Sequence, residues 1–220
     1  GRISWPSACR SNAEGAVRGA NGGTVRKIPS VFERDWDGDR SRITSELTKG
    51  CEWVMSGENV ATRKWDGTAC LVRGNVLFKR YDAKAGRTPP KEFEPAQDAP
   101  DDKTGHWPGW LPVGQGPSDA WHNEAWMHAG YDLPDGTYEL IGPKVGANPE
   151  HMDRHLLIRH GNDVLALGWL PAKSPQDLAD NLASYLSLAR IEGIVFHHPD
   201  GRMAKIKRRD FGLPWPLPKL

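Results

Sequence analysis

Short runs of apolar residues, separated by turn-forming Gly, Pro, Asn and Asp, recur along most of the chain. Residues 69–72 and 76–80 flank Arg73-Gly74-Asn75, a pattern typical of a β-hairpin with a glycine-assisted turn. Similar runs predict a strand at 137–141, a second hairpin formed by 156–158 and 164–167, and a final hairpin formed by 193–198 and 203–207. The pattern therefore predicts a protein built mainly of antiparallel strands.

One segment has the periodicity of an amphipathic helix instead. Ser174 is predicted to cap its N-terminus, with Pro175 in the first turn and Asp177 at the capping-box position. Apolar residues then recur every three or four positions, at Leu178, Leu182, Leu186 and Ala189. A second, short helix is predicted at 121–128. The fold class predicted from these elements is α+β, with antiparallel sheets and flanking helices.

Two stretches lack a clear periodicity. Residues 1–26 are rich in Gly, Ser, Ala and Arg, which predicts a flexible N-terminal arm. Residues 83–135 are dominated by Pro, Gly, Asp and Trp, and a loop this long is seldom without a role in a compact domain. We expect this loop-rich insertion to pack through its tryptophans and to border the active site. The rest of the chain, 27–220, is predicted to form one domain.

Composition limits the classes of protein to consider. The 220 residues carry 29 Lys and Arg against 28 Asp and Glu, so the net charge of +1 excludes a general polycation. No stretch approaches the roughly 18 apolar residues that span a membrane, and we expect a cytoplasmic protein. The three cysteines, Cys9, Cys51 and Cys70, are widely spaced, which indicates reduced thiols and not a zinc site or a disulfide framework.

Four short motifs carry the candidate chemistry. The first is Lys64-Trp65-Asp66-Gly67, where a lysine precedes an Asp-Gly turn and an apolar strand. The other three follow on later predicted strands: Tyr138-Glu139, Glu192-Gly193 and Lys205-Ile206-Lys207. Each motif alone has an ordinary explanation as a turn or an exposed strand, and their order along the chain gives them their weight.

In that order the motifs resemble those of the covalent nucleotidyltransferase superfamily, which contains polynucleotide ligases and messenger-RNA capping enzymes. These proteins carry a Lys-x-Asp-Gly nucleophile, a later strand with a Glu, a Glu-Gly-hydrophobic strand and a closing Lys-x-Lys strand. The matching residues extend from Lys64 to Lys207, over most of the predicted domain.

The resemblance implies that the amine of Lys64 attacks the α-phosphate of ATP to form lysyl-AMP and pyrophosphate. A free lysine has a pKa near ~10.4, so the charged form must be disfavoured by burial or by nearby cations. Lys205 and Lys207 are suited to that task and to holding the triphosphate. Glu192 is expected to anchor Mg²⁺ or Mn²⁺, directly or through water, and Glu139 to accept a hydrogen bond from the ribose.

The resemblance implies further contacts with the nucleotide. Asp66 and Gly67 belong to the nucleotide-binding turn, and Arg80 fits a family arginine that could neutralise phosphate charge. Ile194 is expected to cover one face of the purine, with Trp169 as the candidate for the other face. Lys27, at the start of an extended segment at 27–32, is either a nucleotide contact or a surface lysine.

The register of the final hairpin is a testable part of this interpretation. If Asp200-Gly201 forms a two-residue turn, Phe196 faces Lys205 and Ile194 faces Lys207. Because residues two apart on a strand share a face, Glu192 would then lie on the same surface as both lysines. A slip of one residue would send Glu192 to the other side.

Two departures from the family pattern narrow the function. Ligases and capping enzymes usually have an arginine at the position of Ala69, so a ribose contact must come from elsewhere. The chain also ends soon after Lys207, with no room for the oligonucleotide-binding barrel that capping enzymes need. A single adenylyltransferase domain without that barrel is most similar to a minimal RNA ligase.

We therefore expect a monomeric, ATP-dependent RNA ligase that joins 5′-phosphate and 3′-hydroxyl ends through lysyl-AMP and an adenylated polynucleotide. Its partners would be ATP and RNA strand ends, or DNA ends. The alternatives are a DNA ligase or nick sealer of the same superfamily, and a non-catalytic nucleic-acid-binding module on that scaffold.

Overall fold

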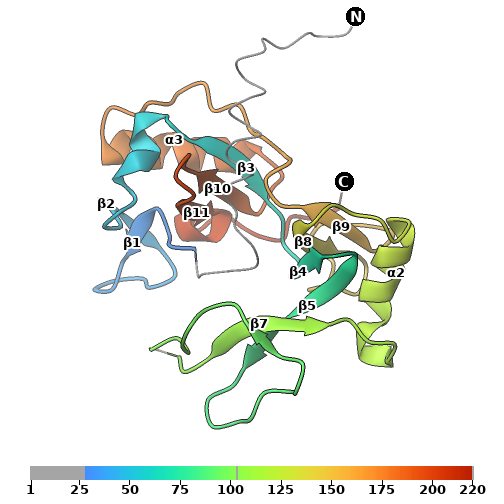
Figure 1. Cartoon of the computed structure of the whole chain (residues 1–220). Helices are drawn as coiled ribbons and strands as arrows, with labels where there is room; N and C mark the ends of the chain where they lie inside the picture. The colour runs from blue at the N-terminus through green and yellow to red at the C-terminus, as the bar shows by residue number, and fades with distance from the viewer. Residues whose placement is uncertain (1–27, 103, 220) are drawn as a thin grey trace, which may run out of the picture.

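The computed structural model describes residues 28–102 and 104–219 (Figure 1). The predicted arm at 1–26 and Lys27 lie outside the described residues. The described chain forms three sheets, and all pairs of named strands are antiparallel. Two α-helices and three short 3₁₀ helices accompany them. The predicted class, α+β with antiparallel sheets and flanking helices, is confirmed.

A three-stranded sheet carries most of the candidate motifs. Its order is β11–β10–β3, with β3 at Val60–Lys64, β10 at Gly193–His197 and β11 at Met203–Lys207. One face of this sheet packs on helix α3, Pro175–Leu188, and forms the larger hydrophobic core (Figure 1). The fully buried side chains at its centre include Leu178, Leu182, Leu186, Ile194, Phe196 and Ile206.

Helix α3 begins as the sequence predicts, and it ends at Leu188, one residue before Ala189. The hydroxyl of Ser174 accepts a hydrogen bond from the backbone N–H of Asp177 at 3.1 Å, which satisfies one of the free donors of the first turn. The three leucines at a spacing of four residues lie on one face and are completely buried. This face holds the helix against the sheet, so the helix fixes the sheet that carries the lysines.

The predicted register of the β10–β11 hairpin is wrong by one residue. Val195 pairs with Lys205, and Gly193 pairs with Lys207. The turn holds three residues, not two, because the N–H of His198 bonds to the carbonyl of Arg202 at 2.9 Å. Gly201 at φ 92° supplies the left-handed residue that such a three-residue turn needs. The Asp-Gly pair was correctly identified as a turn, but its length was not.

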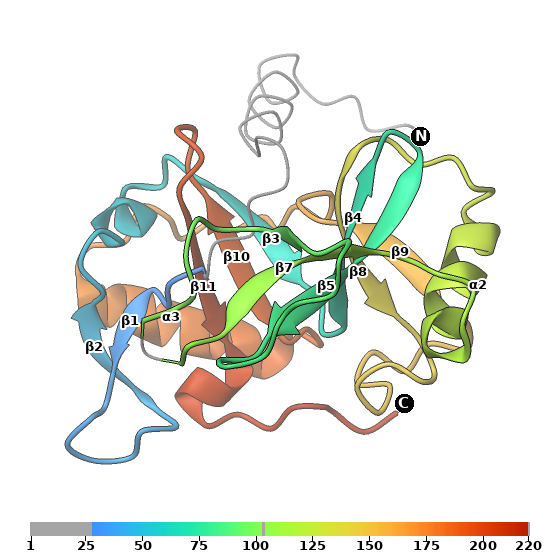
Figure 2. The ribbon, with the colours of Figure 1, turned by 60° about the horizontal axis from the view of Figure 1, so that its bottom comes forward.

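A six-stranded sheet forms the second part of the molecule, in the order β6–β7–β5–β4–β8–β9 (Figure 2). The strands are β4 at Thr68–Arg73, β5 at Val76–Ala83, β6 at Glu94–Pro95, β7 at Trp107–Pro112, β8 at Gly136–Ile141 and β9 at Leu156–Arg159.

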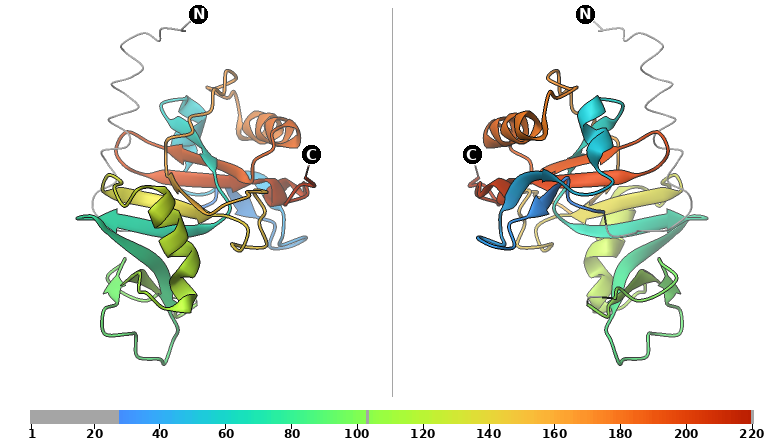
Figure 3. Two further views of the ribbon diagram at one scale, coloured as in Figure 1. Left: turned by 90° about the vertical axis from the view of Figure 1, so that its right-hand side faces the viewer. Right: turned by 90° about the vertical axis from the view of Figure 1, so that its left-hand side faces the viewer.

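The predicted β4–β5 hairpin is confirmed, and its tight turn at Gly74-Asn75 has positive φ at both residues. Helix α2, Ala120–His128, covers one face, as Figure 3 shows, and confirms the predicted short helix.

The predicted second hairpin is wrong. Residues Leu156–Arg159 form β9, which pairs with β8 and not with 164–167. Val164 instead makes a bridge to Thr62 of β3, and the N–H of Leu165 bonds to the carbonyl of Ala61 at 2.8 Å. The chain between 159 and 164 therefore passes from the large sheet to the small one. A run of apolar residues predicts a strand but does not identify the strand that it pairs with, because either sheet can bury the apolar side chains.

The remaining elements are a two-stranded sheet, next to the three-stranded sheet, and three 3₁₀ helices. Strands β1, Phe32–Arg34, and β2, Ile43–Leu47, form a two-stranded sheet, and Ser30 bridges Lys205 in the parallel sense. The 3₁₀ helices are η1 at Glu52–Ser56, η2 at Pro117–Asp119 and η3 at Arg208–Phe211. Among the described residues, no helix has the length and apolar character to cross a membrane.

The core between α3 and the small sheet gives a direct test of the fold. We expect Leu182→Ala to lower the free energy of unfolding by about 2–5 kcal/mol, because it opens a cavity at a fully buried position. Leu188→Ala, at the exposed end of the same helix, is the matched control and is expected to change it by less than about 1 kcal/mol. Chemical denaturation measures both, and equal losses in the two variants would contradict this packing.

Candidate nucleotide-binding site

The pairing of the small sheet places three lysines on one face. Gly193 of β10 lies between Lys64 of β3 and Lys207 of β11, because it pairs with both. Val195, the next residue on that face, pairs with Lys205. Directly paired residues of antiparallel strands point to the same side, so Lys64, Lys205 and Lys207 share the face opposite α3. We call this side of the sheet the lysine face.

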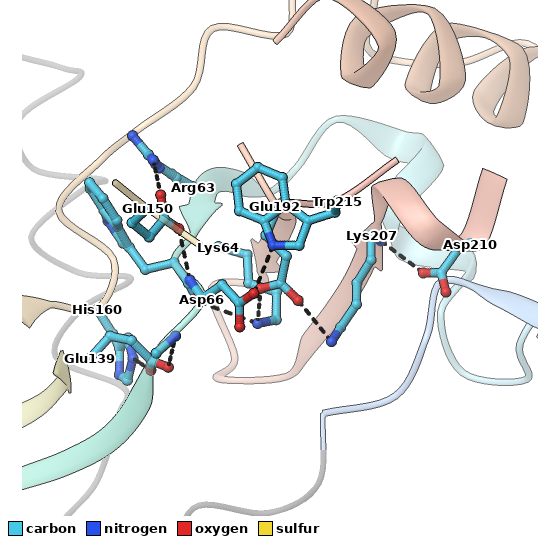
Figure 4. Close-up of polar contacts among 12 residues, drawn as sticks. Arg63, Lys64, Asp66, Glu139, Glu150, His160, Glu192, Lys207, Asp210 and Trp215 are labelled. Carbon is cyan, nitrogen blue, oxygen red and sulfur yellow. Dashed lines mark hydrogen bonds and ion pairs between the residues drawn. The ribbon is translucent and has the colours of Figure 1, made fainter. Parts of the chain in front are cut away.

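Glu192 joins two of these lysines. Its Oε2 lies 2.5 Å from Lys64 Nζ and its Oε1 lies 2.9 Å from Lys207 Nζ, as Figure 4 shows. The Glu192 side chain is 6% exposed, while Lys64 is 20% and Lys207 34% exposed, so the ion pairs are shielded from water on the side of the carboxylate. Since Glu192 precedes β10, strand alternation does not fix its direction, and it reaches the lysine face despite the shifted register.

Gly193 makes this bridge possible. Because it has no side chain, the lysine face is open between Lys64 and Lys207, where the Glu192 carboxylate lies. A Cβ at Gly193 would also come within 2.1 Å of the carbonyl oxygen of Ile206 in the neighbouring strand. The Glu-Gly pair therefore needs its glycine for the close approach of β11 and for the bridging carboxylate.

The electrostatics of the lysine face act most strongly on Lys205. Burial, with smaller contributions from the positive charges of Lys207 and Lys64, lowers the pKa of its amine to about 8, although the carboxylates of Glu192 and Asp210 act in the opposite direction. Val31 and Pro29 hold the backbone of Lys205 through hydrogen bonds of 2.9 Å each, so the strand cannot shift to relieve the crowding. The lysine face is thus a partly buried cationic surface suited to an anion.

A turn of three residues, Trp65–Gly67, connects Lys64 to the large sheet, and contacts from distant segments hold it. The N–H of Gly67 donates to Glu139 Oε1 at 3.1 Å, and a Cβ at Gly67 would lie 2.1 Å from the carbonyl oxygen of Leu140. The Asp-Gly pair therefore allows β4 to lie directly against β8. Glu139 is not simply an exposed strand carboxylate, because it ties this turn to β8.

Two histidines extend the polar contacts near Glu139. His160 Nε2 lies 2.8 Å from Glu139 Oε2, and its Nδ1 lies 3.0 Å from the hydroxyl of Thr137. On the lysine face, His197 Nε2 lies 2.9 Å from Thr62 Oγ1. Burial, with a smaller contribution from His160, lowers the pKa of His197 to about 4, so its ring is uncharged at neutral pH.

Arg80 lies on the same face of the large sheet as Glu139. Lys79 pairs with Cys70, so Arg80 points to the opposite side, the side of Ala69, which pairs with Glu139. In the structure Arg80 is ion-paired to Asp82 at 3.0 Å. Lys79 pairs with buried Asp119 on the far face, as expected of a residue outside the site.

Two predicted purine contacts lie elsewhere. Ile194 is fully buried in the core against α3, on the side away from the lysines, because the hairpin register differs by one residue. The apolar residue on the lysine face is Val195, paired with Lys205. Trp169 packs against the same core as Ile194, and no contact in the described structure brings it to the lysine face.

Sequence reasoning missed four side chains that hold the turn at 65–67, either directly or through Glu139. Glu150 accepts from Arg63 at 2.6 Å and from the N–H of Asp66 at 2.9 Å, and its side chain is 2% exposed. Trp215 donates to Asp66 Oδ2 at 2.7 Å, and Asp163 accepts from the indole of Trp65 at 2.6 Å. The fourth, His160, contacts Glu139, which in turn accepts from the N–H of Gly67. All four lie in segments without helix or strand, where the local sequence contains no signal of a distant partner.

The described residues contain no cluster of three or more His, Cys, Asp or Glu side chains suited to a metal ion. Glu192 contributes one carboxylate, and both of its oxygens face amines. Mg²⁺ is commonly held by one or two carboxylates together with substrate phosphates. The donor set therefore fits an ion that arrives with the phosphates of a nucleotide better than one held by the protein alone.

Comparison with known proteins places this geometry in a family. The family model for RNA ligase 1 matches residues 124–220. RNA ligase 1 of Mus musculus is 31% identical over 275 residues, which cover 90% of this chain and 83% of the relative. RNA ligase 1 of Danio rerio is 26% identical over 279 residues, which cover 89% of this chain and 83% of the relative. The chain belongs to the RNA ligase 1 family.

Proposed function

We propose that this protein is an ATP-dependent RNA ligase that works through a covalent lysyl-AMP intermediate. The single observation that carries the proposal is the ion-paired arrangement of Lys64, Glu192 and Lys207 on the lysine face, with Lys205 beside them. Membership of the RNA ligase 1 family supports RNA ends as the substrate. The three-stranded and six-stranded sheets would together form the adenylyltransferase domain.

In the first step the amine of Lys64 attacks the α-phosphorus of ATP. An N–P bond forms, the bond from the α-phosphorus to the bridging oxygen breaks, and pyrophosphate leaves. The amine must lose a proton, and Glu192 Oε2, 2.5 Å from Nζ, is the nearest group that can take it. Lys205 and Lys207 would bind the phosphate oxygens and offset the charge that develops during transfer.

In the second and third steps the AMP group passes to the 5′-phosphate of an RNA strand, and the 3′-hydroxyl of another strand then displaces AMP. Glu139 would accept a hydrogen bond from the ribose, and Arg80 on the same face would leave Asp82 for a phosphate. Val195, in the position predicted for Ile194, would contact the purine. Glu192 would hold Mg²⁺ or Mn²⁺ together with the phosphates of ATP, and the ion would supply positive charge that offsets the charge of those phosphates.

The proposal predicts that Lys64→Ala abolishes covalent labelling of the protein by α-³²P-ATP, because the variant lacks the amine that forms the N–P bond. Lys173→Ala, an exposed lysine before α3, is the control and should label like the unchanged protein. Gel autoradiography with Mg²⁺ or Mn²⁺ measures both. Undiminished label on Lys64→Ala would reject Lys64 as the nucleophile, and no label on the unchanged protein would favour a binding module.

Sealing assays on the same variants identify the substrate. The unchanged protein should join a 5′-phosphorylated RNA to a 3′-hydroxyl RNA, and Lys64→Ala should not. If DNA ends are joined and RNA ends are not, the protein is a DNA ligase or nick sealer. Replacement of ATP by GTP should remove both label and product.

The lowered pKa of Lys205 predicts the shape of a pH profile. Lys205 must be charged to bind phosphate, and with its pKa at about 8 it loses that charge as the pH rises through this value. The second-order rate constant for adenylylation should therefore fall above a pH of about 8. An arginine keeps its charge, so in Lys205→Arg this fall should disappear up to a pH of about 10. Rate constants measured between pH 6 and 10 test this, and an identical falling limb in both proteins would contradict it.

A further inference from the structure

The turn after Lys64 is held from the far end of the described chain. Residues 213–219 follow η3 and run along one side of the molecule toward the large sheet (Figure 2). Trp215 in this segment donates its indole N–H to Asp66 Oδ2 at 2.7 Å, across 149 residues of sequence. Its side chain is largely buried, and Figure 4 shows it beside Asp66 and Glu192.

The sequence of this segment suits it to act as a rigid strap. Pro214, Pro216 and Pro218 alternate with other residues, and each proline fixes φ and lacks an N–H. The main chain of this segment therefore has more hydrogen-bond acceptors than donors. Four of its carbonyl oxygens form hydrogen bonds with arginine or histidine side chains. The pairs are Pro214 with Arg208 at 2.9 Å, Trp215 with Arg209 at 2.8 Å, Leu217 with His151 at 2.5 Å, and Pro218 with Arg190.

The strap, residues 213–219, and Glu150 both contact Asp66. Trp215 binds the side chain of Asp66, while Glu150 binds its backbone N–H at 2.9 Å. Glu150 also binds Arg63, so residues on both sides of Lys64 are held by one buried carboxylate. Trp215, Glu150 and Arg63 line one small pocket, next to the turn. The two contacts fix the direction in which the chain leaves Lys64.

We propose that Trp215 is a positioning residue for the nucleophile: its indole N–H holds Asp66, and through this turn it aims the amine of Lys64. This inference rests on the proposed function and deepens it. The physical reason is that attack on phosphorus needs the amine within about 3.5 Å of its target and in line with the leaving oxygen. A turn that is free to move would leave the amine beside Glu192 for less of the time.

Trp215→Phe is the test variant, because it keeps an aromatic ring in the pocket while removing the N–H donor and part of the indole ring. Trp36→Phe is the matched control. Trp36 is 61% exposed in the β1–β2 loop, and its ring contact is with Arg40, away from the turn at 65–67. The rate of lysyl-AMP formation and the rate of sealing of pre-adenylated RNA are measured for both. The second reaction does not use the amine of Lys64 as a nucleophile.

We expect Trp215→Phe to slow lysyl-AMP formation about tenfold to a hundredfold, since it removes a hydrogen bond to a carboxylate. Sealing of pre-adenylated RNA should stay within about twofold, even though the loss of a hydrogen bond and of part of a buried ring lowers the Tm below that of Trp36→Phe. Unchanged lysyl-AMP formation would overturn the inference. An equal loss in both reactions would also overturn it, because that result indicates general damage to the site.

A chemical measurement separates this inference from the proposed function. Acetic anhydride labels lysine amines, and mass spectrometry compares Lys64 with exposed Lys173 in the nucleotide-free protein. Trp215→Phe should change the Lys64 labelling rate at least about threefold and leave Lys173 unchanged. If the unchanged protein forms no lysyl-AMP, the proposed function fails, and the labelling ratio alone then decides whether Trp215 positions Lys64. An unaltered ratio would reject the positioning role.

Discussion

The site depends on one carboxylate placed between two amines. Glu192 lies where Gly193 leaves the lysine face open, and its two oxygens take up Lys64 and Lys207 from the strands on either side. Without it, three ammonium groups would lie together on a partly buried surface, and removing one partner from a buried ion pair costs on the order of 3–5 kcal/mol. The same contact that stabilises the resting protein keeps the amine of Lys64, the nucleophile of the proposed reaction, next to a group that can accept its proton.

The candidate site needs residues from both sheets. The small sheet supplies the three lysines and is fixed by the leucine face of α3. The large sheet supplies Glu139 and Arg80 on one face. The turn at 65–67 connects the two sheets, as the segment at 159–164 also does, and Gly67 allows this turn to lie against β8. A ligand bound at this junction would contact both sheets at once.

Most of the strands, helix α3 and the charged residues of the site could be predicted from the sequence, because they depend on local sequence patterns. Alternating apolar residues predict the strands, and a capping serine with regularly spaced leucines predicts α3. The order of the four motifs identifies the three lysines and both glutamates. The failures concern pairing over distance. One extra residue in the Pro199–Gly201 turn shifts the hairpin register, so Val195 and not Ile194 stands on the lysine face. Glu150, Asp163 and Trp215 could not be found, because their partners lie 84 to 149 residues away.

A crystal structure of the protein with an ATP analogue whose α,β-bridge cannot be cleaved tests the central claim most directly. The account predicts the α-phosphorus within about 3.5 Å of Lys64 Nζ, with the outer phosphates against Lys205 and Lys207 and the ribose near Glu139. A nucleotide bound elsewhere, or one whose phosphates do not meet the lysine face while Glu192 still holds Lys64, would contradict it.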